Sequence, residues 1–267
     1  MIPLLFFPQK IVHSSTMERW VGRVALVTGA SVGIGAAITR ALVRHGMIVV
    51  ACARGVDKIQ AIKSELEAES APGKVHPIQC DLTKKDQIAA MFEQIKKEFK
   101  VVHVCINNAG LSFGAHLVKG NPEDWQEALD VNVMALCICT QNSIKLMLDN
   151  KVNDGQIIHL NSMSGHRVVG DGFYCGTKYM VTALTEGLRT ELRAMKTNIR
   201  VCGISPGVVE TEFAPRKARQ DPEECTFYKK NPSIKAEDVA NQVIHILQQP
   251  PYVQIHDILL RPTEQVK

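Results

Sequence analysis

The chain has 267 residues, 45% of them hydrophobic and 5% aromatic, which is enough for one large globular domain or two small ones. Its net charge of +4 at pH 7 is spread over pairs such as Lys84-Lys85 and Lys96-Lys97, so no nucleic-acid-binding surface is indicated. The eight cysteines include no Cys-x-x-Cys pair, so neither a disulfide framework nor a metal site is indicated, and we expect reduced thiols in a cytoplasmic protein.

Residues 1–16 differ from the rest of the chain. Their apolar opening, MIPLLFFP, lacks the basic start of a signal peptide and stops at Pro8, too early to span a bilayer. We expect a disordered extension here and no transmembrane segment, with a weak membrane-surface anchor as the alternative. The folded domain is expected to begin with MERW, at Met17.

Short apolar runs alternate with amphipathic stretches along the remaining chain. The runs predict strands at residues 23–28, 47–52, 74–80, 101–106, 155–161, 199–205 and 252–260. The amphipathic stretches predict helices at residues 33–45, 57–70, 84–99, 123–149, 173–197 and 235–248. Such alternation gives parallel strands joined by right-handed crossovers. We therefore predict an α/β fold over residues 17–267: a single domain with one Rossmann-type, doubly wound, parallel seven-stranded sheet and helices on both faces.

A glycine-rich turn follows the first predicted strand. In TGASVGIGAA, residues Gly29, Gly33 and Gly35 lie where the chain must turn tightly, approach a ligand and open a helix whose N-terminus can face a phosphate. A purely structural turn is the alternative, but this turn is the first crossover of the predicted sheet. The sequence therefore predicts a dinucleotide site here.

The end of the second predicted strand indicates which dinucleotide binds. An acidic side chain there would hydrogen-bond the ribose 2′-hydroxyl of NAD, but the sequence is ACARG, with Arg54 and no carboxylate. A guanidinium group at this position favours the 2′-phosphate of NADP, unless Arg54 is only a solvated surface residue.

Amide side chains follow the fourth strand and interrupt the next helix. NNAG, residues 107–110, is a polar turn at the carboxyl edge of the sheet, where dinucleotides bind, although it could be ordinary loop chemistry. Asn132 lies in the otherwise apolar DVNVMAL, where a short amide is disfavoured unless its hydrogen bonds are satisfied internally. Asn132 alone is equally compatible with a functional and a structural role.

The stretch YCGTK places two functional groups on one helical face. Tyr174 and Lys178 are four residues apart and so stand one turn apart on the predicted helix. A buried cation favours the phenolate, and ionisation near neutral pH requires the phenol pKa to fall by about three units. Ser162, at the end of the fifth strand, could hold a substrate oxygen beside the tyrosine, with Ser164 as the alternative. The pair alone could be incidental, because many helices contain a tyrosine and a lysine.

Taken together and in this order, TGASVGIG, NNAG, Asn132, Ser162, YCGTK and SPGVVET resemble the short-chain dehydrogenase/reductase family over essentially all of the chain after Met17. The resemblance implies that Tyr174 is the general acid or base and that Lys178 holds the nicotinamide ribose and lowers the tyrosine pKa. It also implies that Ser162 orients the substrate oxygen and that Asn132 supports a water-mediated proton relay. The cofactor-binding residues that it implies are Gly29, Ser31, Gly33, Ile34, Gly35, Arg54, Asp81, Leu82, Asn108, Ala109, Gly110, Tyr174, Lys178, Pro206, Gly207, Val209 and Thr211.

Within the family, NSMSGHR, ALTEGLR, ISPGVVETEF and RPTEQV resemble vertebrate dehydrogenase/reductase member eleven and the insect NADP-dependent farnesol dehydrogenases. This implies an NADP(H)-dependent oxidoreductase that interconverts a lipophilic alcohol, such as farnesol or a related isoprenoid or fatty alcohol, with its carbonyl compound. A 3- or 17-ketosteroid/hydroxysteroid dehydrogenase is the alternative enzyme, and a catalytically idle NADP-binding sensor or scaffold is the alternative of another class. The segment HRVVGDGF is shorter than in those relatives, which weakens the prediction of substrate but leaves the chemistry intact.

Two surfaces are expected around this core. Residues 211–234 are expected to close over the substrate, with Phe213 and Phe227 on an apolar underside and with Lys217 and Arg219 on a solvated outer face. Two predicted helices, 123–149 and 173–197, carry more apolar residues than one sheet face would use, namely Leu129, Val133, Leu136, Val181, Leu184 and Leu188. Because members of the family commonly pair through these helices, we expect a homodimer or homotetramer.

Overall fold

A parallel sheet of seven strands forms the centre of the computed structural model, which describes residues 16–114, 117–219 and 225–265. The strands lie in the order β3-β2-β1-β4-β5-β6-β7, and all neighbours are parallel. Their bounds are β1 Val24–Thr28, β2 Ile48–Ala53, β3 Lys74–Gln79, β4 Val104–Asn107, β5 Gln156–Leu160, β6 Arg200–Pro206 and β7 Asp257–Leu260. The strand order reverses between β1 and β4, which is where a doubly wound sheet binds its ligand. The predicted fold class is confirmed.

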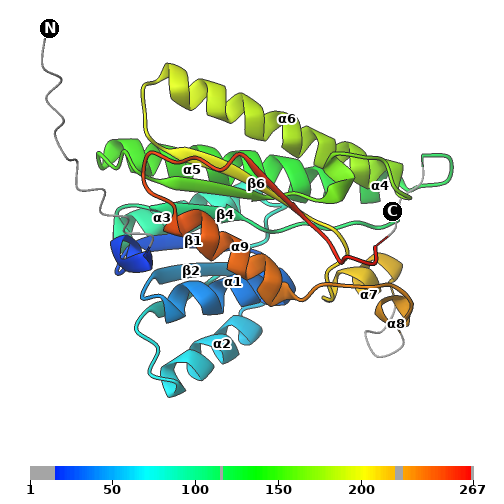
Figure 1. The fold of residues 1–267 in the computed structure, drawn as a ribbon, viewed down its shortest axis with the longest axis horizontal. Coiled ribbons are helices and arrows are strands. Elements are labelled where there is room, and N and C mark those ends of the chain that lie inside the picture. The colour runs from blue at the N-terminus through cyan, green and yellow to red at the C-terminus, as the bar shows by residue number, and fades with distance from the viewer. Residues whose placement is uncertain (1–15, 115–116, 220–224, 266–267) are drawn as a thin grey trace, which may run out of the picture.

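Helices cover both faces of the sheet (Figure 1). On one face lie α1 (Gly33–Arg44), α2 (Asp57–Ala68) and α9 (Ala236–Gln248), and on the other lie α3 (Lys85–Phe99), α5 (Leu136–Asp149) and α6 (Gly172–Ala194). Each face has its own hydrophobic core. Because both sides of the sheet are covered, β1, β5 and β6 are buried along their whole length, and they are mostly apolar, with buried polar side chains such as Gln156 and His159.

The helix predicted at 123–149 is three segments in the structure. It begins as α4 (Pro122–Leu129), continues as a π-helical turn, η2 (Asp130–Ala135), and resumes as α5. A side-chain cap from Asn121 and a proline in the first turn explain the start at Pro122. The π-helical turn contains Asn132, and such turns often occur at functional sites.

The same stretch, Pro122–Asp149, is the one described helical segment that is long and apolar enough to cross a membrane by length and composition. Half of its apolar window is buried inside the protein, where Cys139, Leu146 and Met147 pack against the sheet. Core helices of soluble proteins have the same composition, so burial against the sheet accounts for this apolar stretch.

The ends of the described chain pack on the sheet. A 3-10 turn, η1 (Met17–Trp20), buries Trp20 completely, and its indole N–H donates to the carbonyl of Leu247 at 2.8 Å. Residues 1–15 of the predicted extension lie outside the described residues, so the predicted disorder and the domain boundary stay predictions. At the other end, β7 begins at Asp257 instead of residue 252, because the preceding turn leaves Tyr252 79% exposed.

The residues predicted to face a partner subunit need correction. Val133, Leu136 and Val181 are buried inside the protein at 4%, 6% and 0% exposure, so they belong to its own core. The apolar side chains that these helices leave exposed are Met134, Leu148, Tyr179, Met180 and Met195. Leu129, Leu184 and Leu188 of the predicted set stay partly exposed. A homodimer or homotetramer therefore stays a prediction, without Val133, Leu136 and Val181.

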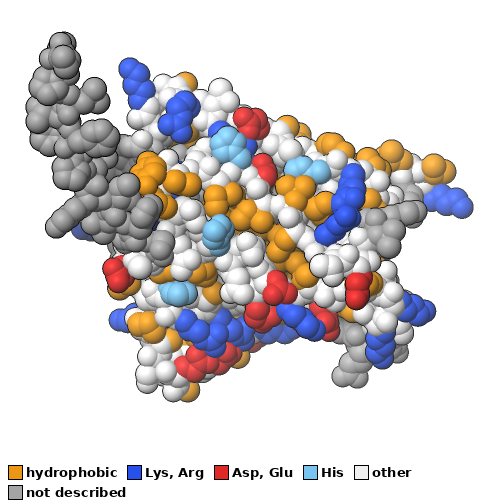
Figure 2. All heavy atoms as spheres, viewed as in Figure 1, with side chains coloured by type: hydrophobic (Ala, Val, Ile, Leu, Met, Phe, Trp, Pro, Cys, Tyr) orange, Lys and Arg blue, Asp and Glu red, His pale blue; other side chains and the backbone are white. Residues whose placement is uncertain are grey.

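Charged side chains of both signs lie close together over α1 and α2 (Figure 2). Arg40 pairs with Glu65 at 2.7 Å and Arg44 pairs with Glu69 at 2.8 Å. Over α1 and α2, positive charge is therefore matched by nearby carboxylates and does not form a separate basic patch.

All eight cysteines are free thiols, and six of them are buried. Burial raises the pKa of Cys80 to about 11, and it also raises the pKa of Cys139 well above its ordinary value. Thiols with raised pKa values are poor nucleophiles, which fits structural rather than catalytic cysteines.

Candidate active site

The glycine turn after β1 has a shape that other residues cannot adopt. Gly29 has a φ of +64°, in the left-handed region that favours glycine. A Cβ on Gly35 would lie 2.3 Å from the carbonyl oxygen of Gly29 and 2.5 Å from the Asn108 amide nitrogen. The turn leads into α1, whose N-terminus has no side-chain cap. Free backbone N–H groups and the helix dipole at this place suit a phosphate.

Asn108 holds this turn against the neighbouring strand. Its side-chain amide donates to the carbonyl oxygens of Thr28 (2.8 Å) and Gly29 (3.1 Å), and its backbone N–H donates to the Thr28 hydroxyl at 3.0 Å. Its amide N–H groups are thus used within the protein. The NNAG sequence therefore has a structural role here, which is to fix the glycine turn at the end of β1.

Arg54 and Asp81 lie at the carboxyl ends of the neighbouring strands β2 and β3. The Arg54 side chain is 69% exposed, and its ion-pair partner, Glu127, lies 3.8 Å away. Burial acts to raise the pKa of Asp81, but hydrogen bonds from Thr83 and the charge of Arg54 outweigh it, so the pKa is lowered and the carboxylate stays ionised. Leu82 is buried in the core beneath them.

The stretch after β6 lies against the glycine turn. A Cβ on Gly33 would be 3.0 Å from the Thr211 methyl group, so Thr211 touches the start of α1. A Cβ on Gly207 would lie only 2.2 Å from the side-chain oxygen of Gln265. The same oxygen accepts a hydrogen bond from the Val208 N–H at 3.0 Å. Val209 is buried. At Gly207 and Val209 only the backbone is therefore free to meet a cofactor.

Tyr174, Ser162 and Lys178 converge at the carboxyl end of β5. Tyr174 lies in the first turn of α6, and the Ser162 side chain is close enough to act on the pKa of its phenol. The Ser162 hydroxyl also accepts from the backbone N–H of Ser164 at 3.1 Å, and it is Ser162, not Ser164, that acts on the phenol pKa. Lys178 is 4% exposed, its ammonium donates to the Leu160 carbonyl at 2.9 Å, and it lies 5.8 Å from the centre of the Tyr174 ring.

Burial dominates the electrostatics of this group. It raises the pKa of Tyr174, the Ser162 hydrogen bond acts in the opposite direction, and the charge of Asp171 adds to the rise. Burial also lowers the pKa of Lys178 to about 8. The lowering of the Tyr174 pKa by Lys178, which the resemblance implies, stays a prediction: the ammonium donates to the Leu160 carbonyl and also lies 5.8 Å from the centre of the Tyr174 ring.

Asn132 is 1% exposed and its side-chain amide is fully used by the protein. Its oxygen accepts from the Leu111 N–H at 2.8 Å, and its nitrogen donates to the Leu111 carbonyl at 2.9 Å and to the Thr177 hydroxyl at 3.0 Å. It thereby pins the segment after β4 to α6. A Cβ built on Gly110 would lie 3.5 Å from the Asn132 side-chain oxygen and 3.6 Å from the Lys178 ammonium. The side chains of Asn132 and Lys178 are therefore neighbours.

Aromatic residues stand beside Tyr174. Phe213, at the start of α7 (Phe213–Ala218), has its ring centre 5.7 Å from that of Tyr174. Phe173 stacks on Trp125 of α4 at 5.5 Å. Phe227, in α8 (Phe227–Lys230), was expected on the apolar underside of the lid, but it is 42% exposed. Residues 220–224 of the predicted lid lie outside the described residues.

The two lid cations expected on the solvated face, Lys217 and Arg219, have side chains that are 37% and 64% exposed, and both also pair with carboxylates. Arg219 donates to both oxygens of Asp124 at 2.7 Å. The Lys217 ammonium lies 3.9 Å from a carboxylate oxygen of Asp171, which is only 4% exposed. The lid segment is thus tied to α4 and to the start of α6.

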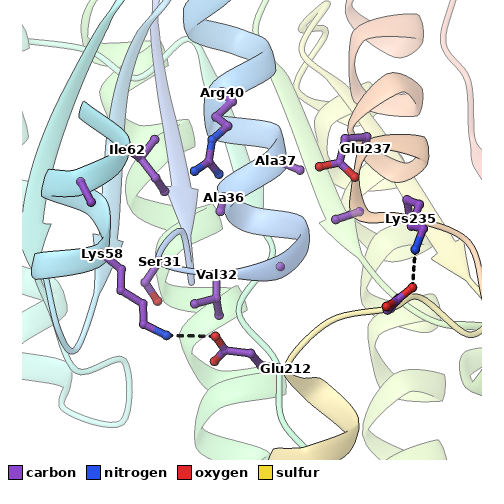
Figure 3. Close-up of a pocket in the computed structure, with 14 residues that line it drawn as sticks. Ser31, Val32, Ala36, Ala37, Arg40, Lys58, Ile62, Glu212, Lys235 and Glu237 are labelled. Atoms are coloured by element: carbon purple, nitrogen blue, oxygen red, sulfur yellow. Dashed lines mark hydrogen bonds and ion pairs between the residues drawn. The ribbon is translucent and has the colours of Figure 1, made fainter. Parts of the chain in front are cut away.

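A cavity of about 450 Å³ lies on the outer side of the glycine turn, between α1, α2 and the start of α9 (Figure 3). An ion pair between Lys58 and Glu212, with a distance of 2.9 Å, crosses beside Ser31 at its edge. Lys235 and Glu210 form a second pair there. Since these cations already have carboxylate partners, the cavity extends the glycine-turn site and does not form a separate anion site.

Sequence reasoning missed Asp171, Ser112 and Thr177. Asp171 accepts from the backbone N–H of Tyr174 at 3.1 Å and from the Ser112 hydroxyl at 2.7 Å. An aspartate three residues before an expected first-turn residue is a helix N-cap signal, so this residue could have been found. Nothing in the sequence around Ser112 or Thr177 indicates which side chains they meet.

Comparisons with known proteins agree with this geometry. A family model described as short chain dehydrogenase matches residues 23–222. The chain is 54% identical over 254 residues to dehydrogenase/reductase SDR family member 11 of Gallus gallus, which covers 94% of this chain and 100% of that protein. It is 40% identical over 250 residues to a farnesol dehydrogenase of Aedes aegypti, and the match covers 92% of this chain and 98% of that protein. The closed form of a serine dehydrogenase complexed with NADP+ matches with a TM-score of 0.83 at 30% identity, over 91% of this chain and 96% of that one.

Proposed function

Because the chain belongs to the short-chain dehydrogenase/reductase family, we propose that it is an NADP(H)-dependent oxidoreductase that interconverts a lipophilic alcohol and its carbonyl compound. One observation carries the proposal: Tyr174, Ser162 and Lys178 converge beside a glycine turn that is shaped for a dinucleotide. A catalytically idle nucleotide binder would have no use for a phenol and a serine hydroxyl at this place, and all four residues that the resemblance implies for catalysis, Asn132, Ser162, Tyr174 and Lys178, are present.

Each side chain of the site has its own role in the proposed reaction. When bound, NADP(H) supplies or accepts the hydride. Tyr174 donates a proton to the carbonyl oxygen in reduction and accepts it from the alcohol in oxidation. Ser162, which acts on the pKa of that phenol, holds the same oxygen in line. Lys178 contributes positive charge beneath the ring and a donor for the nicotinamide ribose, and Asn132 links the site to α6 and to Leu111.

NADP is the proposed cofactor because Arg54 follows β2 and no carboxylate stands beside it on that strand. Its side chain is exposed and only loosely paired, at 3.8 Å, so it can turn to a 2′-phosphate. Replacing it by glutamine tests this. A charge-assisted contact of about 1.5–3 kcal/mol corresponds to roughly a 10- to 100-fold loss in kcat/KM for NADPH, with NADH unaffected. Arg44→Gln, on the outer side of α1, is the matched control.

A lipophilic substrate is proposed from the groups around Tyr174. Phe213 faces its ring, Phe173 and Trp125 form a stacked pair on neighbouring helices, and Val168 and Val169 are 69% and 41% exposed just before α6. These groups offer burial to an alkyl or isoprenoid chain, worth about 0.8 kcal/mol per methylene. The similarity to a farnesol dehydrogenase supports the same class.

A matched substrate series tests the proposal. Values of kcat/KM are measured with NADP for farnesol, geraniol, octanol, a 17-hydroxysteroid and a small hydrophilic alcohol. We expect efficiency to rise with apolar chain length, and Tyr174→Phe to lose about 100-fold or more in kcat while NADPH affinity is kept. Preference for the hydrophilic alcohol would contradict the substrate class, and preference for the steroid would indicate the alternative enzyme. Turnover of no alcohol or carbonyl compound would contradict the enzymatic function.

A cytoplasmic location is also proposed, since all eight cysteines are free and six are buried.

A further inference from the structure

A buried carboxylate at the start of α6 has no part in the chemistry described so far. Asp171 is 4% exposed and is the N-cap residue of this helix. One carboxylate oxygen accepts from the backbone N–H of Tyr174 at 3.1 Å. Asp171 therefore ends the loop before α6 and fixes the turn from which the Tyr174 side chain projects.

The second carboxylate oxygen joins two other segments to the same point. It accepts from the Ser112 hydroxyl at 2.7 Å, and Ser112, only 4% exposed, belongs to the segment that follows β4. The ammonium of Lys217, on α7, lies 3.9 Å from the same oxygen. The Lys217 side chain also runs past Gly114, whose Cβ would lie 3.8 Å from it. Three segments far apart in the sequence thus meet at one carboxylate.

We propose that Asp171 is a positioning residue, which holds the first turn of α6, and with it Tyr174, in register with the segment after β4 and with α7. The inference rests on the proposed function, because it places Asp171 relative to the reacting phenol. Neither neighbouring residue can replace it, since Gly170 and Gly172 have no side chain that could accept these bonds.

The charge of Asp171 has a measurable consequence. Tyr174 faces Ser162 from the end of β5, Lys178 and Cys175 from α6, Phe213 from α7, and Asp171 from the helix cap. The negative charge of Asp171 raises the pKa of Tyr174, and Ser162 lowers it. Lys217 is the cation paired with Asp171, and its side chain is 37% exposed, so it offsets this charge only in part.

Two substitutions distinguish the effect of the Asp171 charge from the effect of its hydrogen bond with the Tyr174 N–H. Asp171→Asn keeps an oxygen for the Tyr174 N–H but removes the charge, so the ascending limb of the pH profile of alcohol oxidation, along which Tyr174 loses its proton, should move to lower pH by roughly 0.5–1 unit. Asp171→Ala removes the cap as well, so kcat should fall about tenfold while KM for NADP changes little, and asparagine should rescue most of that loss.

Lys217→Met provides the opposite perturbation. It leaves the carboxylate without its cation, so the same limb should move to higher pH, by less than the asparagine shift because Lys217 is partly exposed. Arg216→Met, which removes the neighbouring cation of α7 that pairs with Glu212, should leave the pH profile unchanged.

The outcomes distinguish this inference from the proposed function. If Asp171→Asn and Lys217→Met leave the pH profile unshifted and Asp171→Ala keeps full kcat, the positioning role is refuted, whereas an inactive Tyr174→Phe would leave the enzymatic assignment standing. If Tyr174→Phe is fully active, the proposed function itself fails. Should Asp171→Ala not fold, the opposite shifts of the asparagine and methionine variants still decide the case.

Discussion

Replacing Lys178 with methionine should make the protein more stable while abolishing its activity. Burial lowers the pKa of this lysine from 10.5 to about 8, and 1.36 kcal/mol per unit makes the cost of the buried ammonium about 3 kcal/mol at neutral pH. Methionine fills a similar volume without charge. It leaves the Leu160 carbonyl without its donor, which costs about 1–3 kcal/mol. The expected net gain is about 1 kcal/mol.

The pH dependence identifies the cause. The ammonium penalty is fully present below pH 8, where the lysine is protonated in both the folded and the unfolded state. It disappears as the pH rises from 8 towards 10.5, because the folded protein then binds fewer protons than the unfolded chain, so wild-type stability rises. The stability difference between the methionine variant and the wild type should therefore change by about 2 kcal/mol between pH 7 and 9.5, from an advantage of about 1 kcal/mol to a disadvantage of about 1 kcal/mol.

Urea denaturation of both proteins at several pH values measures this difference. The other buried titratable groups, such as Tyr174 and Cys52, occur in both proteins and cancel in the comparison. A variant that is less stable than the wild type at every pH, with a difference that does not change between pH 7 and 9.5, would show that Lys178 carries no such penalty.

Two further predictions concern packing and assembly. Gly35→Ala would place a methyl group 2.3 Å from the Gly29 carbonyl, so it should lower the free energy of unfolding by about 1–3 kcal/mol and abolish NADPH binding, as measured by thermal denaturation and NADPH fluorescence. In the control, Gly187→Ala in α6, a Cβ meets nothing within 4 Å, so this variant should be slightly more stable than the wild type. An equal effect of the two substitutions would contradict the packing argument. Met180→Glu, on the exposed face of α6, should convert the expected dimer or tetramer to monomers in sedimentation, whereas Tyr252→Glu, at an exposed site outside these helices, should not. A wild-type monomer at micromolar concentration would overturn the second prediction.

Strand positions were predictable because a covered parallel sheet imposes a simple pattern. β1, β5 and β6 are buried throughout, and the short apolar runs within them are typical of strands in a sheet covered on both faces. The π-helical turn at Asp130–Ala135 was not predictable, since its backbone pairing leaves no mark on a 3.6-residue apolar period. The true length of β7 was also missed, because the apolar residues before Asp257 lie in a turn.

The sequence predicted which residues form the candidate site, but not which atoms those residues contact. The motifs named Tyr174, Lys178 and Ser162, yet the lysine bonds a backbone carbonyl and not the phenol. Asn132 could be read as functional or structural, and only the structure shows that its hydrogen bonds are satisfied by Leu111 and Thr177. These hydrogen-bond partners are brought together by segments that are far apart in the sequence. The residues around each partner therefore do not indicate which side chain it will meet.

The contact between Gln265 and Gly207 links the binding turn to a distant part of the chain. Gln265, the last described residue, fills the space beside Gly207 and accepts from the Val208 N–H, so the turn at the proposed nicotinamide end is completed by a residue far from it in sequence. Met17–Trp20 instead pack near the end of α9, where Trp20 donates to Leu247. A truncation that removed Gln265 would therefore leave the Val208 N–H without this acceptor and open the space beside Gly207, although every recognised motif would still be present.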